Sequence, residues 1–181
     1  MSEPLRFMVD RIDTPIGEMM IAFDEEGNLR AVDWTDYEPR MQSLLRRQYG
    51  AHGFTLEPGK CPQRFTDAIN RYFSGDLAAL DTLPVATAGT PFQRAVWQAL
   101  REIPCGTTVS YAALAQKIGR PSAMRAVGLA NGSNPVGVIV PCHRVIGANG
   151  SLTGYGGGLD RKRWLLDHES NSLVFDKAPP S

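Results

Sequence analysis

The chain has 181 residues, 43% of them apolar, and its 19 Lys/Arg and 19 Asp/Glu give a formal net charge of zero. This length suits one large or two small domains, and the apolar fraction is enough for a buried core. No window of about 18 apolar residues exists, and the start lacks the basic-then-apolar pattern of a signal peptide, which excludes a membrane-spanning protein and predicts a cytoplasmic one.

The first part of the chain mixes strand and helix signals. Apolar or alternating runs between turn residues predict strands over Leu5–Ile12, Gly17–Phe23 and Leu29–Trp34. Apolar residues at helical spacing predict helices over Tyr37–Tyr49 and Pro62–Phe73. We interpret residues 1–75 as a small α/β domain with a mainly structural role.

Residues 76–89 have few helix signals and are typical of a linker, so a second domain is expected over residues 90–170. Its first helix is expected at Thr90, a good N-cap, because Pro91 fits the first helical position. Ser110 is expected to cap a helix over 111–118 and Ser122 a second helix over 123–130. Two short helices joined by a tight turn containing Gly119 form a helix-turn-helix.

Such a helix pair is more often ordinary packing than a DNA-binding element, but the charge around it favours DNA. Residues 94–163 hold nine Lys/Arg and only two Asp/Glu, a net charge of +7, whereas residues 1–93 hold nine and fourteen, a net charge of −5. This uneven distribution indicates a polyanion as partner.

The apolar run Val136–Val140 predicts a buried strand, which Pro141 would end because proline has no backbone N–H. Cys142 would then follow a rigid element, with His143 beside it. Because the thiolate is the nucleophilic form, we expect His143 to remove the Cys142 proton through a water molecule. The alternative is a small buried cysteine next to a structural histidine.

The end of the chain predicts one more helix, capped by Asp160 and running to about Glu169. Residues 171–181 are expected to form a disordered tail. The three cysteines form no C-x-x-C, and the three histidines show no zinc-site spacing, so reduced thiols, no metal and no other cofactor are expected.

Several segments, in the same order along the chain, resemble those of a known protein family. The pentapeptide Pro141-Cys142-His143-Arg144-Val145 follows Asn134, which lies eight residues before the cysteine. Further segments are Thr90-Pro91-Phe92-Gln93, Ile103-Pro104-Cys105-Gly106, Arg125-Ala126-Val127-Gly128 and Trp164-Leu165-Leu166. Together they resemble the O6-alkylguanine-DNA alkyltransferases, the methylated-DNA–protein-cysteine methyltransferases. Three earlier segments resemble the bacterial constitutive branch called Ogt, namely Thr14-Pro15-Ile16-Gly17, Ala31-Val32-Asp33-Trp34 and Asp81-Thr82-Leu83-Pro84.

This resemblance implies a ribonuclease H-like α/β N-terminal domain and a mainly α C-terminal domain with a winged-helix-like helix-turn-helix. It implies an enzyme that repairs DNA by direct reversal, moving an alkyl group from guanine O6 in double-stranded DNA to its own Cys142. The reaction would be a single turnover that inactivates a monomeric protein without a cofactor. Activity on O4-alkylthymine and the preference among alkyl groups stay open.

The resemblance also implies catalytic roles. Cys142 would be nucleophile and acceptor, His143 the water-mediated base, and Glu169 the partner of its imidazolium. Tyr111 would donate a hydrogen bond to N3 of the leaving guanine. Asn134 would brace the turn before the cysteine through backbone hydrogen bonds.

DNA contacts are implied for the second helix of the helix-turn-helix. Arg125 resembles the family's arginine finger, which fills the base stack after the target base has flipped out. Small residues, namely Ala126, Gly128 and Ala130, would let this helix approach the minor groove closely.

The implied substrate pocket contains Val145, Tyr155 and Gly156, under a flexible lid formed by Thr153–Leu159. Tyr155 would stack on the base. Many members of the family carry a serine where this chain has Gly156, and the missing side chain is expected to widen the pocket for larger alkyl groups.

Three other functions fit this sequence less well. An alkyltransferase-like factor that binds lesions without repairing them lacks the motif cysteine, which Cys142 supplies here. A helix-turn-helix regulator of the adaptive response would carry an N-terminal cysteine cluster, and this chain has none before Cys61. A cysteine hydrolase usually draws its histidine from far along the chain, not from the adjacent position.

Overall fold

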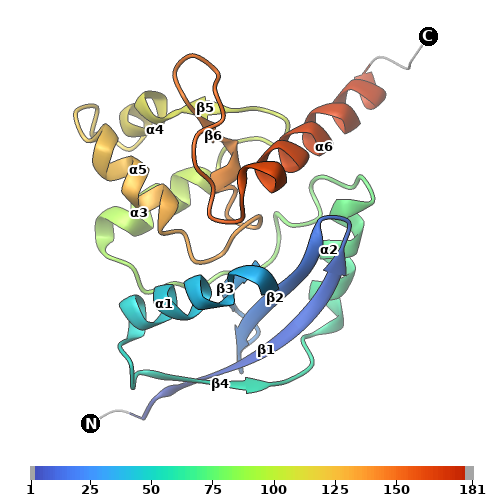
Figure 1. The fold of residues 1–181 in the computed structure, drawn as a ribbon, viewed down its shortest axis with the longest axis vertical. Helices are drawn as coiled ribbons and strands as arrows, with labels where there is room; N and C mark the ends of the chain where they lie inside the picture. Colours follow the sequence, from blue (N-terminus) through green and yellow to red (C-terminus); the bar gives the residue numbers. More distant parts are fainter. Residues whose placement is uncertain (1–2, 178–181) are drawn as a thin grey trace.

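The computed structural model describes residues 3–177, with side chains as far as Ser170, and shows two halves in contact (Figure 1). The elements of the N-terminal half are β1 (Leu5–Thr14), β2 (Gly17–Asp24), β3 (Leu29–Trp34), η1 (Thr35–Tyr37), α1 (Glu38–Tyr49), β4 (Phe54–Pro58) and α2 (Gln63–Phe73). Those of the C-terminal half are α3 (Pro91–Arg101), β5 (Val109–Ser110), α4 (Tyr111–Lys117), α5 (Met124–Gly132), η2 (Cys142–Arg144), β6 (Val145–Ile146) and α6 (Leu159–Lys177).

The N-terminal half is a mixed sheet of order β3-β2-β1-β4, in which β4 runs parallel to β1 and the other pairs are antiparallel. Side chains alternate between the two faces of a strand. In β2, Met20 packs in one cluster with Met41 of α1, whereas Ile21 packs in another with Phe65 of α2. Both faces of the sheet are therefore covered, and the α/β fold expected for this half is confirmed.

Helices dominate the C-terminal half, as expected. The predicted start of α3 is confirmed, because the Thr90 hydroxyl accepts a hydrogen bond from the backbone N–H of Gln93 at 3.1 Å. The cap of α4 is also confirmed, since the Ser110 hydroxyl accepts from the Ala113 N–H at 3.0 Å. The cap predicted for the next helix is wrong: α5 begins at Met124, after Ala123, without a side-chain cap.

The two halves share one core. The backbone of Val32 in β3 accepts a hydrogen bond from Gly137 at 3.0 Å and donates one to Pro135 at 2.9 Å. The segment before Cys142 is thereby attached to the edge of the N-terminal sheet. The segment 76–89 also packs against this sheet, because Leu80 and Leu83 are buried in the shared core.

Two further expectations for the C-terminal half are wrong. Val136–Val140 does not form a strand: it turns, with Val138 at a φ of 68° and an isolated bridge from Val136 to Val32. α6 starts one residue before Asp160 and continues to Lys177, so residues 171–177 of the predicted tail are helical. Residues 178–181 lie outside the described residues. No helix in the described part of the chain is long and apolar enough to cross a membrane.

Candidate active site

Cys142 opens the 3₁₀ turn η2, and Asn134 fixes the backbone that leads into it. The Asn134 side chain donates to the Val140 carbonyl at 2.8 Å and accepts from the Val136 N–H at 3.0 Å. These are the backbone contacts that the sequence predicts for Asn134. They close the turn on which the cysteine is presented.

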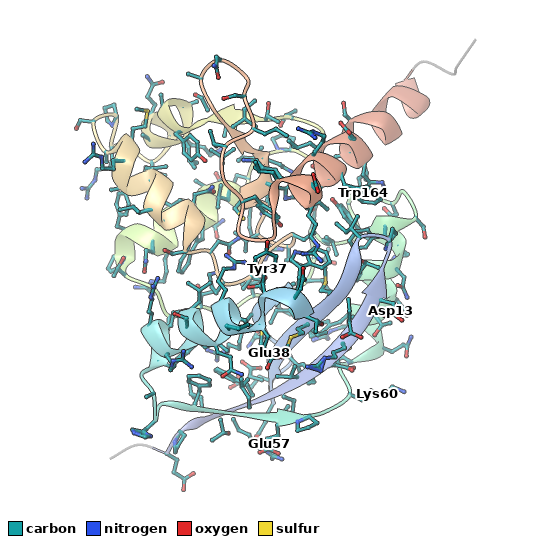
Figure 2. All side chains as sticks on the ribbon, in the orientation of Figure 1. Asp13, Tyr37, Glu38, Glu57, Lys60 and Trp164 are labelled. Carbon is teal, nitrogen blue, oxygen red and sulfur yellow. The ribbon has the colours of Figure 1, made fainter. Side chains whose placement is uncertain are left out.

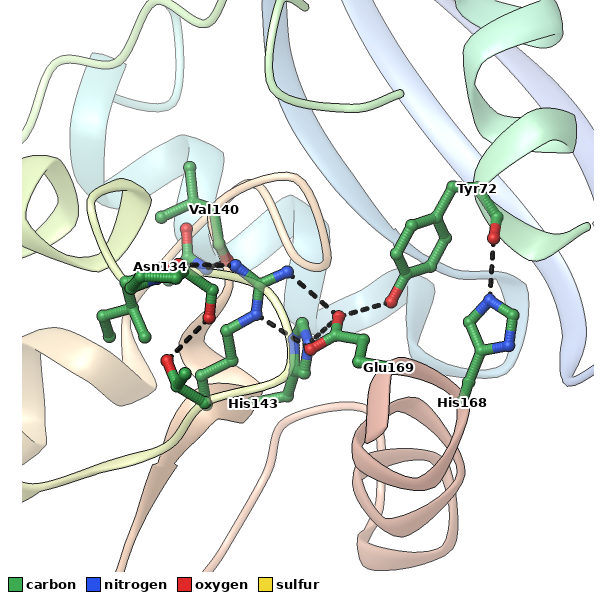
Figure 3. Close-up of polar contacts among 10 residues, drawn as sticks. Tyr72, Asn134, Val140, His143, His168 and Glu169 are labelled. Atoms are coloured by element: carbon green, nitrogen blue, oxygen red, sulfur yellow. Dashed lines mark hydrogen bonds and ion pairs between the residues drawn. The ribbon is translucent and has the colours of Figure 1, made fainter. Parts of the chain in front are cut away.

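A buried polar cluster surrounds Glu169 and includes His143, the residue after Cys142 (Figure 3). One ring nitrogen of His143, Nε2, is 2.8 Å from Glu169 Oε2, and both side chains are at most 1% exposed. The other ring nitrogen, Nδ1, is buried and has no hydrogen-bond partner among the described residues. This leaves Nδ1 as the ring atom that can exchange a proton.

Two further groups hold the Glu169 carboxylate. Arg144 donates from Nε to Oε1 at 2.9 Å and from Nη2 to Oε2 at 3.0 Å, and the hydroxyl of Tyr72 donates to Oε2 at 2.6 Å. Burial opposes ionisation of Glu169, but the charges and hydrogen bonds of His143 and Arg144 outweigh it and hold its pKa well below the usual value. Glu169 is therefore a permanent carboxylate beside the imidazole.

Cys142 itself is 8% exposed. Burial raises the pKa of its thiol, although the interaction with Asn134 and the positive charges of Arg40 and Lys162 act in the opposite direction. The thiol is thus the resting form at neutral pH, and a nucleophilic reaction requires a base to remove its proton.

A small cavity of about 20 Å³ lies against Cys142, large enough for about one water molecule. Both halves of the chain line it, with Val32, Asp33, Trp34, Arg40, Asn131, Gly132, Gly137, Val138, Cys142, Gly154, Tyr155 and Gly156. A mainly structural role was expected for the N-terminal half, but its β3 and α1 supply one wall of this cavity.

The wider pocket expected at Gly156 is absent from this structure. A Cβ atom at Gly156 would collide with the guanidinium of Arg40, so the space is already filled. Arg40 pairs there with the buried carboxylate of Asp33 at 2.9 Å. In this structure the missing side chain makes room for Arg40, and the expected tolerance of larger alkyl groups stays a prediction.

Of the other residues predicted for the pocket, Tyr155 lines this cavity, whereas Tyr111 and Val145 do not. Tyr155 lines it, with its ring edge-on to that of His143 at 6.5 Å between centroids. The Tyr111 hydroxyl is 2.8 Å from that of Thr153, where the lid begins. Val145 is fully buried and contributes its carbonyl, which accepts a hydrogen bond from Lys162 at 2.7 Å.

The residues predicted to contact DNA divide into two groups along α5. Arg125 and Ala126 are exposed, and Gly128 lies against the Tyr111 ring. Ala130 is buried and its carbonyl accepts a hydrogen bond from Trp97 at 2.8 Å, so it packs inside the protein and does not face outward as expected. The exposed surface of α5 also carries Leu129, 69% exposed.

Four residues at this site had no role in the sequence analysis: Tyr72, Arg144, Arg40 and Lys162. Arg144 belongs to the Pro141–Val145 motif, so its position beside the nucleophile was a usable signal. The other three come from α1, α2 and α6, far from the motif in sequence. Only the tertiary structure brings them together.

Comparisons with known proteins agree on one family. A model described as 6-O-methylguanine DNA methyltransferase, DNA binding domain, matches residues 91–171, and a model of the ribonuclease-like domain of the same methyltransferase matches residues 9–87. A methylated-DNA–protein-cysteine methyltransferase of Salmonella typhimurium is 51% identical over 170 residues, which cover 94% of this chain and 99% of that protein.

More distant relatives give the same result. A methylated-DNA–protein-cysteine methyltransferase of Methanosarcina barkeri is 43% identical over 164 residues, 91% of this chain and 98% of that protein. The crystal structure of Mycobacterium tuberculosis OGT in complex with DNA is similar with a TM-score of 0.74 and 42% identity, covering 93% of this chain and 94% of that one.

Proposed function

Because this chain belongs to the 6-O-methylguanine DNA methyltransferase family and repairs alkylated DNA by direct reversal, we propose that the sulfur of Cys142 accepts the alkyl group from guanine O6. The observation that carries the proposal is the buried contact between His143, the residue directly after this cysteine, and Glu169. Their side chains are 2.8 Å apart. A permanent carboxylate on one side of an imidazole makes its other side a better proton acceptor.

The first step is removal of the thiol proton. Burial raises the pKa of Cys142, so the thiolate does not form readily by itself. The proton passes through a water molecule to Nδ1 of His143, the ring nitrogen without a partner among the described residues. Glu169, bound to Nε2, stabilises the imidazolium that results.

The second step is the transfer itself. A lone pair of the Cys142 sulfur forms the new S–C bond while the C–O6 bond breaks, and its electron pair remains on the guanine. Tyr111 donates a proton to guanine N3, and the proton held by His143 returns to Tyr111 through solvent. The products are a neutral guanine and a thioether, which is not hydrolysed under mild conditions, so each chain reacts once.

A base does not fit the pocket as it stands, because a purine is many times larger than the water-sized cavity. The lid Thr153–Leu159 and the guanidinium of Arg40 therefore move aside while the base enters, and the lid then closes over the bound base. The exposed Arg125 of α5 fills the gap left in the duplex. We propose duplex DNA containing O6-alkylguanine as substrate, a monomer as the acting form, and the cytoplasm as location, where thiols stay reduced.

The experiment measures the transfer of radiolabel to the protein from DNA that contains O6-methylguanine with a labelled methyl group. Wild-type protein should become labelled and Cys142→Ser should not, because a serine hydroxyl is far less ionised and less nucleophilic. Cys61→Ser is the control, since its thiol is buried in the N-terminal half beside Thr66. Full labelling of Cys142→Ser would contradict the proposal.

A further inference from the structure

The end of the lid Thr153–Leu159 is held by Arg161, in the first turn of α6. Its Nη1 donates to the carbonyl of Gly157 at 3.1 Å, and its Nε donates to the carbonyl of Ile16, between β1 and β2, at 2.9 Å. Its Nη2 pairs with Asp36 of η1 at 2.9 Å. One side chain therefore connects the lid to two segments of the N-terminal half.

The N-terminal half also contacts the lid directly. The Arg161 guanidinium lies 4.5 Å from the ring centroid of Trp34, the last residue of β3. A Cβ at Gly157 would approach Trp34 Nε1 to 2.6 Å, so this ring and the lid backbone are in close contact. The Arg161 side chain is only 15% exposed, and a Cβ at Gly17 would approach its Nη2 to 2.7 Å. Tyr37 and Trp164 lie on the facing surfaces of the two halves (Figure 2).

The contacts of Arg161 and Trp34 with Gly157 affect Tyr155, which lies two residues before Gly157. Tyr155 forms the part of the lid that lines the Cys142 cavity, and its backbone carbonyl accepts a hydrogen bond from Gly158 at 3.0 Å. This bond closes a turn that contains Gly157, so a side chain that holds Gly157 also restrains the backbone of Tyr155. At the other end of the lid, Lys162 donates to the Thr153 carbonyl at 3.0 Å, so neighbouring residues of α6 fix both ends.

We propose that Arg161 is a positioning residue of the methyl-transfer reaction: through it the N-terminal half holds the lid, and with it Tyr155, in place over Cys142. The proposal rests on the proposed function. Arg161 suits this role because its rigid, planar fork binds two carbonyls and a carboxylate at once, which a lysine cannot do.

The test compares Arg161→Met with Arg163→Met, a substitution of the same type at an exposed position of the same helix. The rate of reaction with free O6-benzylguanine, which needs pocket and lid but no DNA, should fall at least about tenfold in Arg161→Met. It should stay within about twofold in Arg163→Met. Arg161→Lys should recover only part of the rate, because it can make only some of the contacts.

Two further readouts separate positioning from general loss of stability. Reaction of Cys142 with iodoacetamide, which needs no ordered lid, should become faster in Arg161→Met because the buried thiol is uncovered. Hydrogen exchange should accelerate in the lid but not in the sheet strands β1–β3. Faster exchange throughout the chain would show that Arg161 only stabilises the fold, and an unchanged or slower reaction with iodoacetamide would show that Arg161 does not hold the lid over Cys142.

The possible failures are distinguishable. If wild type and Arg163→Met transfer no alkyl group to Cys142, the proposed function is wrong. If both transfer it and Arg161→Met does so at the same rate, the function stands and the role of Arg161 is refuted.

Discussion

Glu169 is the residue whose surroundings explain most about the site. A carboxylate that is 1% exposed is tolerated because three side chains donate hydrogen bonds to it, those of Tyr72, His143 and Arg144. Removing one partner of such a buried ion pair is costly, because the remaining charge has no solvent to stabilise it. Glu169 thus links the α2 and α6 helices to the segment of the nucleophile.

Glu169→Gln should change how stability depends on pH. The pKa of Glu169 lies below its ordinary value of 4.5 in the folded protein, so its contribution to stability is present above about pH 4.5 and is lost as pH falls. Wild type should lose stability on acidification more steeply than Glu169→Gln, and the variant should be less stable by about 3 kcal/mol at pH 7. Urea unfolding between pH 7 and pH 3 measures both.

Asp167→Asn is the matched control for that measurement, because Asp167 is an exposed acid on the same helix. It should keep the wild-type pH dependence. Equal pH dependence in wild type and Glu169→Gln would mean that the carboxylate does not contribute as its contacts indicate.

At the scale of single residues, the sequence predicted the reacting residues better than the side chains that hold them in position. Cys142 and His143 stand next to each other in a motif, and the backbone contacts of Asn134 follow from its residue type. Tyr72 and Arg40 had no local signal, because a tyrosine or arginine on a helix is compatible with many surroundings. Their role depends on how α2 and α1 pack against the C-terminal half.

Elements with strong terminal signals were predicted well, and those defined by tertiary contacts were not. α3 begins where Thr90 and Pro91 indicate, and β3 has the predicted bounds. β4 was missed although residues 54–57 alternate between apolar and polar, because the run is only four residues long before Pro58. The apolar run Val136–Val140 is buried as expected, but apolar composition does not distinguish a strand from a buried turn.

The DNA-binding role proposed for α5 can be tested through Arg125. Arg125→Ala should slow repair of duplex DNA by about tenfold to a hundredfold, the cost of one lost base-stacking contact. The rate with free O6-benzylguanine should change little, because Arg125 is exposed and outside the cavity lining. The measurement is the ratio of the two rates.

Arg120→Ala provides the control, since Arg120 is an exposed cation in the turn between α4 and α5. It should affect duplex repair much less than Arg125→Ala. If Arg125→Ala lowers the duplex and free-base rates by the same factor, Arg125 supports the fold and not base flipping.

At the scale of the whole molecule, the charge pattern predicted a DNA partner because residues 94–163 are rich in cations. This reason is only partly correct, because not all of these cations face outward. Of the nine cations in residues 94–163, Arg144 binds Glu169, Arg161 holds the lid and Lys162 is buried. Their charges act inside the protein. Four exposed cations remain near the helix-turn-helix: Arg94, Lys117, Arg120 and Arg125.

This smaller number predicts a moderate salt dependence of DNA binding. If up to four cations each neutralise one phosphate, log K should fall with log[salt] with a slope of about −3 to −4. Fluorescence anisotropy with undamaged duplexes of different sequence should give similar slopes and affinities. A slope near zero, or tight binding to a single sequence, would contradict this mode of binding.

The assignment of Cys142 as acceptor is tested most directly by mass spectrometry after reaction with excess duplex DNA that contains O6-methylguanine. Each chain should gain one methyl group in place of the thiol proton, a net mass of CH2, on the peptide with Cys142, while Cys61 and Cys105 stay unmodified. A methyl group on either other cysteine, or more than one guanine restored per chain, would contradict it.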